Sequence, residues 1–476
     1  MLRALAKDGS IYTVANFLTK GFSFLLLPFY THVFLKSTVG IIDILSVFSL
    51  FMTSLVCFQL NQGMGRYVAD PDQSEDSQIK YGSSAIWFTS FSYLLFATLL
   101  VIFPDYFIDL LSADTKVPKS TFRYAVIGMS LTGIVYFIGV YLRFMRRSKA
   151  FALITFSHGF LTTALIFLFI IKFKLGLNSV YIAPIVSGPI IIVIQLMVIK
   201  DKLKLTIDWN KIKELFVYSM PLVPASIAYV VLNFTDRLFI KEYLSFEELG
   251  TYGIAAKFSS IIQIIILGVS AALGPIAYQR AVDDSIKPEL SRVFRLFIAF
   301  GMLGVLTLSL FSFETLYLLT PPEYYEAKDV MPILYFSAFF GGFSMFSIGL
   351  HLKKKTNVIA VVVILTSLLN VGLNYVLISK FQLYGAAIAT LISIFINNIA
   401  LVYFSQKYFK LHFHYRTIGV VFLLVSISVY FGCYVLPGLK LNLFIVIALK
   451  LLLISIFAVT LFYIKLVNPR NPFKKT

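Results

Sequence analysis

Residues 250–268 read GTYGIAAKFSSIIQIIILG, a stretch that is apolar enough to cross a membrane as a helix but contains one charged side chain, Lys257. A bilayer core about 30 Å thick requires about 20 such residues. An ammonium group at mid-helix costs roughly 2.5–3.5 kcal/mol on insertion scales. A lysine at this position must therefore face protein, water or a charged partner.

The composition indicates an integral membrane protein. Of the 476 residues, 59% are hydrophobic and 13% are charged, and the mean hydropathy is +0.86, which excludes a soluble globular chain. The two cysteines, Cys57 and Cys433, and the five histidines have no metal-ligand spacing. We therefore expect no disulfide framework, no metal site and no cofactor.

Windows of about 20 apolar residues predict an all-α polytopic membrane protein with about fourteen transmembrane helices. The predicted spans are 10–35, 40–62, 81–103, 121–144, 151–171, 179–199, 217–241, 249–276, 294–319, 330–352, 357–379, 383–405, 417–436 and 442–464. A polar break follows the sixth span. The predicted parts are an N-terminal lobe of six helices at 1–200, a cytoplasmic linker at 201–216, a second six-helix lobe at 217–410, and two helices with a cytoplasmic tail at 411–476.

Lysine and arginine residues in the connecting segments predict the orientation. With the N-terminus inside, the cytoplasmic segments hold 27 of these residues, the other side holds 11, and three lie within spans. Because cytoplasmic loops are enriched in positive charge, both termini are expected in the cytoplasm. The net charge of +18 is thus explained by topology and by attraction to membrane lipids, and no nucleic acid partner is expected.

A short repeat indicates how the helices are grouped. The segment FLKSTVGIIDILS at 34–46 matches YLSFEELGTYGIAA at 243–256: each has a leucine, a short polar turn and a glycine, Gly40 or Gly250, that opens the next helix. The two glycines are 210 residues and six helices apart, so both enter the membrane from the same side. Such a parallel repeat predicts two six-helix bundles around a central cavity.

Polar residues inside the spans fall on common helix faces when 100° is counted per residue. Lys257 shares its face with small residues. Lys20 lies ten residues into the first span, about 15 Å deep at 1.5 Å per residue, on one stripe with Asn16. The seventh span carries Asn233 and Arg237 in the same manner. We therefore expect these five side chains to line a cationic cavity.

Purely structural roles compete with this interpretation. A buried lysine can pair with a carboxylate such as Asp43 and fix the packing of helices. Arg237 and Asp236 lie near the outer end of their span, where a solvated salt bridge is the alternative. Asn370 and Asn374, one turn apart, are expected to hydrogen-bond neighbouring helices.

Several ordered segments resemble one known family. They are GSIYTVANFLTKGFSFLLLPFY at 9–30, YSMPLVPASIAYVVLNFTDRLFIKEYLSFEELGTYGIAAKF at 218–258, LLTPPEYYEAKDVMPIL at 318–334 and LKKKTNVIAVVVILTSLLNVGLNYVLISKFQLYGAAIATLIS at 352–393. The chain is similar over nearly its whole length to bacterial polysaccharide flippases of the Wzx type. These belong to the multidrug, oligosaccharidyl-lipid and polysaccharide (MOP) exporter superfamily.

The resemblance implies a fold like that of multidrug and toxin extruders (MATE), with two six-helix lobes in a V and two extra C-terminal helices. It also implies translocation of undecaprenyl-pyrophosphate-linked oligosaccharide units, for O-antigen, capsule or a similar polysaccharide. Transport would run from the cytoplasmic to the outer leaflet of a bacterial inner membrane. Polysaccharide polymerase and chain-length proteins are the partners that the resemblance implies.

The charges inside the spans suit this substrate. A diphosphate within a membrane needs cations, and Lys20 and Lys257, one from each predicted lobe, are placed to supply them. Because the chain has no G-x-x-x-x-G-K-[ST] phosphate loop, no nucleotide is expected as energy source. Outward movement of negative charge is favoured by roughly 2.3 kcal/mol per charge per 100 mV. Exchange against H⁺ or Na⁺ would add to this, with Asp43 and Asp236 as candidate ion-coupling residues.

Three other functions stay open. A multidrug extruder of the same fold should favour buried acids over the lysines found here. A lipid II flippase shares the fourteen-helix plan and a cationic cavity, but its arginine-rich first helix is not seen in this sequence. An O-antigen polymerase or ligase, the enzyme alternative, needs a sizeable outer loop, whereas the longest predicted outer connection, 104–120, has seventeen residues. We therefore expect a transporter without catalytic residues.

Overall fold

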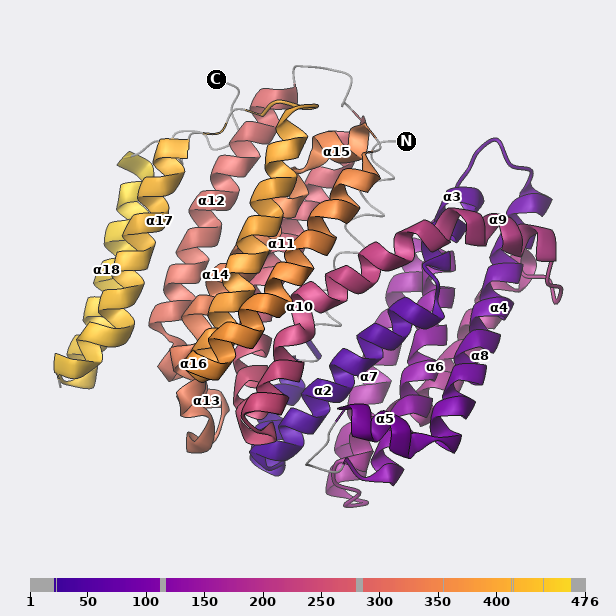
Figure 1. Cartoon of the computed structure of the whole chain (residues 1–476), viewed down its shortest axis with the longest axis horizontal. Helices are drawn as coiled ribbons and strands as arrows, with labels where there is room; N and C mark the ends of the chain where they lie inside the picture. The colour runs from indigo at the N-terminus through magenta and orange to yellow at the C-terminus, as the bar shows by residue number, and fades with distance from the viewer. Residues whose placement is uncertain are drawn as a thin grey trace. The chain divides into compact units, whose positions relative to one another are not determined.

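The computed structural model describes residues 21–22, 24–111, 117–279, 286–353, 355–411, 413, 415–439 and 441–463. Within these ranges the regular secondary structure is helical, and no β-strand is present (Figure 1). The α-helices up to residue 279 are α2 (Lys36–Val56), α3 (Leu60–Val68), α4 (Glu75–Ile102), α5 (Pro104–Leu111), α6 (Lys119–Phe144), α7 (Ser148–Ile171), α8 (Asn178–Ile199), α9 (Trp209–Ser219), α10 (Val223–Tyr243) and α11 (Phe246–Gln279). Those that follow are α12 (Ile286–Leu310), α13 (Ser312–Leu319), α14 (Met331–Gly341), α15 (Ile348–Leu352), α16 (Thr356–Gln406), α17 (Tyr415–Tyr430) and α18 (Leu443–Tyr463).

These helices are those of a multi-pass membrane protein. Among the described residues, eleven helices are long and apolar enough to cross a bilayer. One of them, α16, is two helices merged across a kink, because Gln382 leaves the helical conformation with φ 52° and ψ −131°. The kink lies where the sequence predicts the boundary between two spans. Phe24–Val33 and α11 coincide with the first and eighth predicted spans, so every predicted span contains helix within the described ranges.

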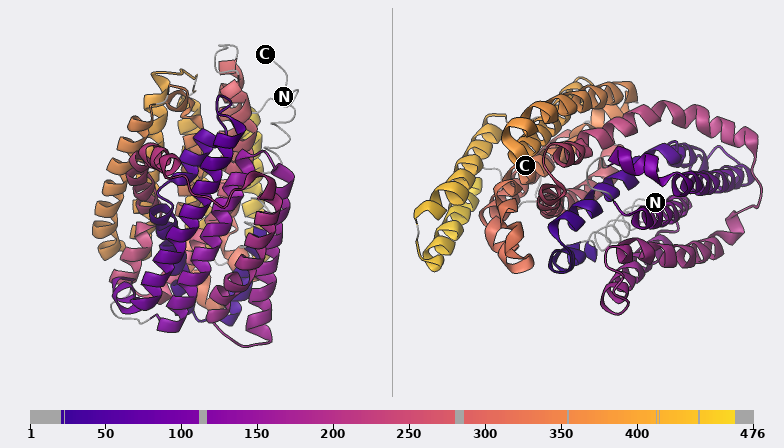
Figure 2. Two further views of the ribbon diagram at one scale, coloured as in Figure 1. Left: turned by 90° about the vertical axis from the view of Figure 1, so that its right-hand side faces the viewer. Right: turned by 60° about the horizontal axis from the view of Figure 1, so that its bottom comes forward.

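The chain forms two compact units, residues 1–250 and 251–476. In the first unit α6 packs against α4 and α8, and α7 packs against α8. This unit also contains α10, which runs beside α2 (Figure 2). The linker predicted at 201–216 contains the start of α9, whose first turn is capped by the carboxylate of Asp208. The lobes at 1–200 and 217–410 remain a prediction.

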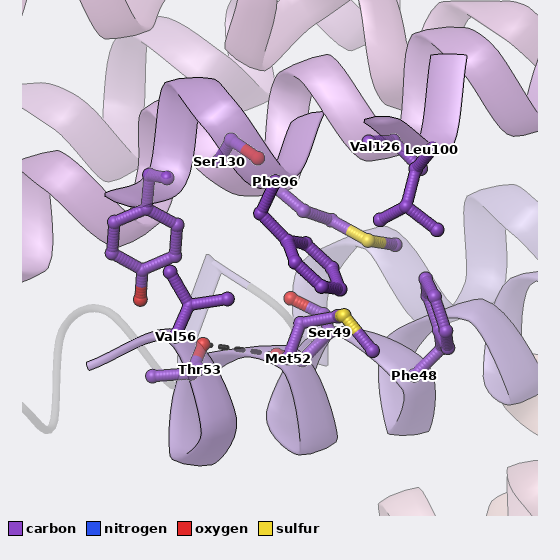
Figure 3. A pocket seen from close by; sticks show the side chains of 11 residues that line it. Phe48, Ser49, Met52, Thr53, Val56, Phe96, Leu100, Val126 and Ser130 are labelled. Atoms are coloured by element: carbon purple, nitrogen blue, oxygen red, sulfur yellow. Dashed lines mark hydrogen bonds between the residues drawn. The ribbon is translucent and has the colours of Figure 1, made fainter. Parts of the chain in front are cut away.

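One face of α2 is part of a closely packed core. Phe48 of α2, Phe96 of α4 and Val126 of α6 surround a void of about 10 Å³ (Figure 3). This volume is at the lower limit for a single water molecule. The one hydrogen bond drawn there stays within α2, from Thr53 Oγ1 to the carbonyl oxygen of Ser49 at 2.9 Å. This face of α2 therefore leaves no room for a larger ligand.

In the second unit α14 packs against α12 and α16, and α17 and α18 lie against α12 as a pair (Figure 1). Amides and hydroxyls join the two halves of α16. Asn370 Nδ2 donates to Ser393 Oγ at 3.3 Å, and Thr366 Oγ1 donates to Asn397 Oδ1 at 3.0 Å. Asn374 Nδ2 donates to Asn370 Oδ1 at 2.9 Å. The predicted hydrogen bond to a neighbouring helix is confirmed for Asn370. The same prediction for Asn374 is wrong, because its amide donates to Asn370 one turn away in the same helix.

The two copies of the short repeat begin their helices at equivalent residues. α2 begins at Lys36 and α11 begins at Phe246. These two starts are separated by the same number of residues as Gly40 and Gly250. A Cβ atom added to Gly40 would overlap the carbonyl oxygen of Phe246, and one added to Gly250 would overlap that of Lys36. These added atoms would also lie 3.2 and 3.3 Å from the amide nitrogen of the partner glycine. The contact is thus reciprocal, as in an isologous interface.

Candidate functional site

Three charged side chains meet where the beginning of α2 packs against the end of α10. Arg237 Nη1 lies 2.7 Å from Asp236 Oδ1, and Arg237 Nε lies 3.4 Å from Asp43 Oδ2. Arg237 Nη1 also donates to the carbonyl oxygen of Asn233 at 3.2 Å. The guanidinium carbon lies 5.2 Å from the ring centroid of Phe234, within the range of a cation–π contact. We call Asp43, Asp236 and Arg237 the Arg237 cluster.

The Arg237 cluster is largely removed from solvent. The side chains of Asp236, Arg237 and Asp43 are 1%, 10% and 14% exposed. Asp236 Oδ1 also accepts a hydrogen bond from the main-chain N–H of Arg237 at 2.9 Å. In contrast, Asp43 Oδ2 is buried and accepts no hydrogen bond. The alternative of a solvated salt bridge between Arg237 and Asp236 is therefore wrong, since both side chains are buried.

The cluster itself holds two carboxylates and one guanidinium. A buried acceptor that is left without a hydrogen bond is costly, and Asp43 Oδ2 is such an acceptor. A role of Asp43 and Asp236 in ion coupling stays a prediction. The two carboxylates of the cluster pair with Arg237. The sequence predicts Arg237 to line a cationic cavity instead.

The polar face predicted for the seventh span is present on α10. Ser226, Tyr229, Asn233 and Arg237 follow one another at intervals of three or four residues, so they share one face of the helix. Asn233 is half-buried, and its Nδ2 donates to the carbonyl oxygen of Tyr229 at 2.7 Å. The Arg237 cluster thus lies at one end of a longer polar stripe.

Lys257, the residue that interrupts the apolar stretch of α11, belongs to the second unit. Its side chain is half-buried. Ser260 Oγ donates to the carbonyl oxygen of Lys257 at 2.6 Å, and residues three apart share a helix face. Lys20 and Asn16 lie outside the described residues, so their place in a cationic cavity stays a prediction.

A cavity of about 570 Å³ lies within the first unit, lined by residues of α2, α3, α6 and α10. This volume falls in the range of about 300–1,000 Å³ that is typical of ligand sites. Three amide side chains, Gln59, Asn61 and Gln62, and the rings of Tyr136 and Tyr229 line it. None of the described residues that line the cavity is charged. The described part of the lining is therefore polar and uncharged.

These amides are not among the predicted site residues, although CFQLNQGMG at 57–65 places three amides in an otherwise apolar region. The second span was predicted to continue to residue 62, whereas α2 ends at Val56. Phe58 and Gln59 then adopt φ angles of 46° and 55° before α3 begins. Such left-handed conformations cost about 1–3 kcal/mol in non-glycine residues and are concentrated at functional sites.

Within the described residues, no group of three or more His, Cys, Asp or Glu side chains could hold a metal ion. Cys57 and Cys433 are both free thiols. Cys57 Sγ lies 3.0 Å from the hydroxyl of Tyr93, which makes it part of the packing between α2 and α4.

Two sequence families match the chain. Residues 5–279 match the family described as polysaccharide biosynthesis protein, and residues 221–376 match the MatE family. The first match extends over more than half of the chain. The chain belongs to the polysaccharide biosynthesis protein family. The resemblance found in the sequence analysis is thus confirmed by a match that includes α2 to α11.

Curated relatives of this polysaccharide biosynthesis protein are distant. One, from Haloferax volcanii, is named "Probable low-salt glycan biosynthesis flippase Agl15" and is 25% identical over 284 residues, 56% of this chain and 57% of the relative. Another, the uncharacterized membrane protein MJ1068 of Methanocaldococcus jannaschii, is 23% identical over 213 residues, 43% of this chain and 42% of the relative. The chain thus spans about half the length of these relatives.

Solved transporter structures share the fold. The lipid II flippase MurJ, in an inward closed conformation, matches with a TM-score of 0.67 and 18% identity, covering 95% of this chain and 98% of MurJ. An inward-facing multidrug resistance MATE family transporter of the MOP superfamily matches with a TM-score of 0.70 and 10% identity, covering 89% of this chain and 99% of the transporter. This polysaccharide biosynthesis protein therefore has the MATE-like MOP fold predicted from its sequence.

Proposed function

We propose that the protein is a flippase for undecaprenyl-pyrophosphate-linked oligosaccharide repeat units, which serve O-antigen, capsule or a similar polysaccharide. It moves them from the cytoplasmic to the outer leaflet of a bacterial inner membrane. The observation that carries this proposal is the match of residues 5–279 to the polysaccharide biosynthesis protein family. One sequence relative is named a probable glycan biosynthesis flippase, and one solved structure of the same fold is the lipid II flippase MurJ.

The substrate has three parts that need different surroundings. Its lipid tail can stay in the bilayer, whereas its diphosphate needs cations and its sugars need hydrogen-bond partners. Lys20 and Lys257 are the proposed partners of the diphosphate, with Asn16 and Asn233 as additional hydrogen-bond donors. Arg237 can join them only when it is released from a carboxylate of the Arg237 cluster.

The Arg237 cluster is the proposed ion-coupling site. Neutralising Asp43 or Asp236 with H⁺ or Na⁺ removes half of the ion pairing that holds Arg237, and so weakens the packing of α2 on α10 at that end. Ion binding is thereby linked to movement of these two helices. The membrane potential adds a favourable contribution of roughly 2.3 kcal/mol per negative charge moved outward per 100 mV.

Other functions fit the observations less well. A multidrug extruder for organic cations would need anionic side chains in its cavity, and no charged residue lines the 570 Å³ cavity in the described part of the chain. A lipid II flippase has the same fold, but the sequence family that matches is described by polysaccharide biosynthesis. An O-antigen polymerase or ligase would be an enzyme, for which the family match gives no support. Polysaccharide polymerase and chain-length proteins remain the proposed partners.

Deletion of the gene in the native host tests the proposed function. Intact repeat units should accumulate on the lipid carrier in the cytoplasmic leaflet, because synthesis continues while export stops. Accumulation of single units in the outer leaflet would contradict the proposal and indicate a polymerase. Reporter fusions at residues 147, 205 and 354 and at the C-terminus should all report cytoplasm, as the proposed topology requires.

A further inference from the structure

The amides of Gln59, Asn61 and Gln62 are polar groups that the fold itself does not use. They lie between the end of α2 and the first turn of α3 and line the 570 Å³ cavity. No side-chain hydrogen bond engages any of the three within the described residues. Asn61 Oδ1 is buried without a partner. Leaving a buried acceptor unpaired costs about 1–3 kcal/mol, so a ligand in this cavity has polar groups to satisfy.

The backbone holds these amides in place at an energetic cost. Phe58 and Gln59 are consecutive non-glycine residues in the left-handed region, where side chains are strained. A continuous helix through residue 62 would avoid this strain, but Gln59 and Asn61 would then lie about 200° apart, on opposite faces. The break between α2 and α3 thus gathers them at one cavity.

The chemistry of the lining selects a class of ligand. An amide both donates and accepts hydrogen bonds, which suits the paired hydroxyl groups of a sugar. Tyr136 and Tyr229, 46% and 58% exposed, present rings with an apolar face and a polar tip. Among the lining residues that the structure describes, a diphosphate would find no cation and an organic cation would find no anion. A lipid tail would leave the amides unpaired.

We propose that this cavity is a sugar subsite that binds the uncharged, hydroxyl-rich part of the lipid-linked oligosaccharide. Gln59, Asn61 and Gln62 form hydrogen bonds to sugar hydroxyls, and Tyr136 and Tyr229 pack against the sugar rings. The inference rests on the proposed flippase function and adds the residues that recognise the glycan.

The amides of the sugar subsite lie apart from the Arg237 cluster, although Phe234 both lines the cavity and contacts the guanidinium of Arg237. Tyr229 precedes Arg237 by eight residues in α10, which corresponds to about 12 Å along a helix. On α2, Ser54 lines the cavity, eleven residues after Asp43. Substitutions in the subsite can therefore be tested without altering the charged cluster.

The test measures binding of two lipids to the full-length protein in nanodiscs by native mass spectrometry. One probe is undecaprenyl pyrophosphate, and the other is the undecaprenyl-pyrophosphate-linked repeat unit extracted from the native host. Detergents with sugar headgroups must be avoided because they would compete for the subsite. The variants are Asn61→Leu and Gln62→Leu, and Asn210→Leu, an exposed amide of α9, is the matched control.

We expect Asn61→Leu and Gln62→Leu to lose about three- to ten-fold in affinity for the glycan-bearing lipid, the worth of one neutral hydrogen bond. Their affinity for undecaprenyl pyrophosphate should stay unchanged, as should both affinities of Asn210→Leu. Tyr229→Ala, which removes an exposed ring from α10, provides the same comparison if Asn61→Leu does not fold.

Two kinds of failure can be distinguished. One outcome is that the wild-type protein binds the glycan-bearing lipid more tightly than undecaprenyl pyrophosphate while the variants keep that preference. This result would contradict the sugar subsite but not the proposed flippase function. Equal losses for both lipids in the variants would also overturn the subsite. If the wild-type protein bound neither lipid, the proposed function would fail and the subsite with it.

Discussion

Gly40 and Gly250 pack against each other through reciprocal contacts. Backbone atoms of each copy of the short repeat lie directly beside the glycine of the other copy. The carbonyl oxygen of Phe246 lies beside Gly40, and that of Lys36 lies beside Gly250. Each carbonyl belongs to the first residue of its helix, four residues before the glycine of the same copy. Small residues allow membrane helices to approach this closely.

This contact predicts that Gly40→Ala and Gly250→Ala destabilise the protein. A methyl group at either position would force the starts of α2 and α11 apart, and overpacking of this kind costs about 1–3 kcal/mol. Gly372→Ala is the control, because nothing lies within 4 Å of a Cβ atom there and alanine favours a helix interior by about 1 kcal/mol. Thermal unfolding in nanodiscs measures the difference. Equal stability of all three variants would show that the junction is not tightly packed.

The Arg237 cluster predicts an unequal response to its substitutions. Arg237→Gln removes the guanidinium that contacts both buried carboxylates, so the free energy of unfolding should fall by roughly 3–5 kcal/mol. Adding Asp43→Asn to that variant removes one of the stranded charges and should restore part of the folded protein. The yield of monodisperse protein in size-exclusion chromatography measures this. A double variant no better than Arg237→Gln would contradict the pairing of Asp43 with Arg237.

Asp43→Asn alone tests ion coupling, because Asp236 still pairs with Arg237. The folded yield should stay near that of the wild type, whereas transport should no longer depend on an imposed H⁺ or Na⁺ gradient. Glu247→Gln, a carboxylate change in the first turn of α11, serves as the control and should keep the gradient dependence. If Asp43→Asn responded to the gradient like the wild type, Asp43 would have no part in coupling.

Charge at Lys20 and Lys257 is predicted to be essential for transport. Lys20→Arg and Lys257→Arg should keep partial export. Export by Lys20→Gln and Lys257→Gln should fall roughly ten- to a hundred-fold, because each loses a charge-assisted hydrogen bond worth about 1.5–3 kcal/mol. Export of glycan at matched protein levels provides the measurement. Full export by well-expressed glutamine variants would rule out a role in binding the diphosphate.

The buried pair Lys450–Glu314 is predicted to support the fold only. Lys450 Nζ lies 2.5 Å from Glu314 Oε1, and the two side chains are 7% and 21% exposed. Glu314→Gln should lower the unfolding temperature because it leaves a buried ammonium group without its counter-charge. Transport per folded molecule should stay unchanged, and the pair Glu314→Leu with Lys450→Met should recover stability. Loss of transport in that stable double variant would assign the pair a functional role.

Much of the fold could be predicted from the sequence because the bilayer imposes one length on apolar helices. Even the boundary inside α16 was predictable, and Gln382 marks it in the structure. The pairing of Asp43 with Arg237 was not, because it joins helices almost 200 residues apart and hydropathy does not report which helices are neighbours. The break at Phe58 and Gln59 lacks the glycine or proline that normally marks such a turn. The amides of the cavity were missed for that reason.

Reconstitution in liposomes tests the proposed flippase activity. Purified protein is placed in liposomes that carry the fluorescent undecaprenyl-pyrophosphate-linked repeat unit in both leaflets, and an impermeant quencher is added outside. With the protein present, the lipid of the inner leaflet should become accessible to the quencher as it crosses the membrane. A fluorescent phospholipid in the same liposomes should stay protected. If the protected fraction of the glycan lipid stayed the same with and without active protein, the flippase function would be contradicted.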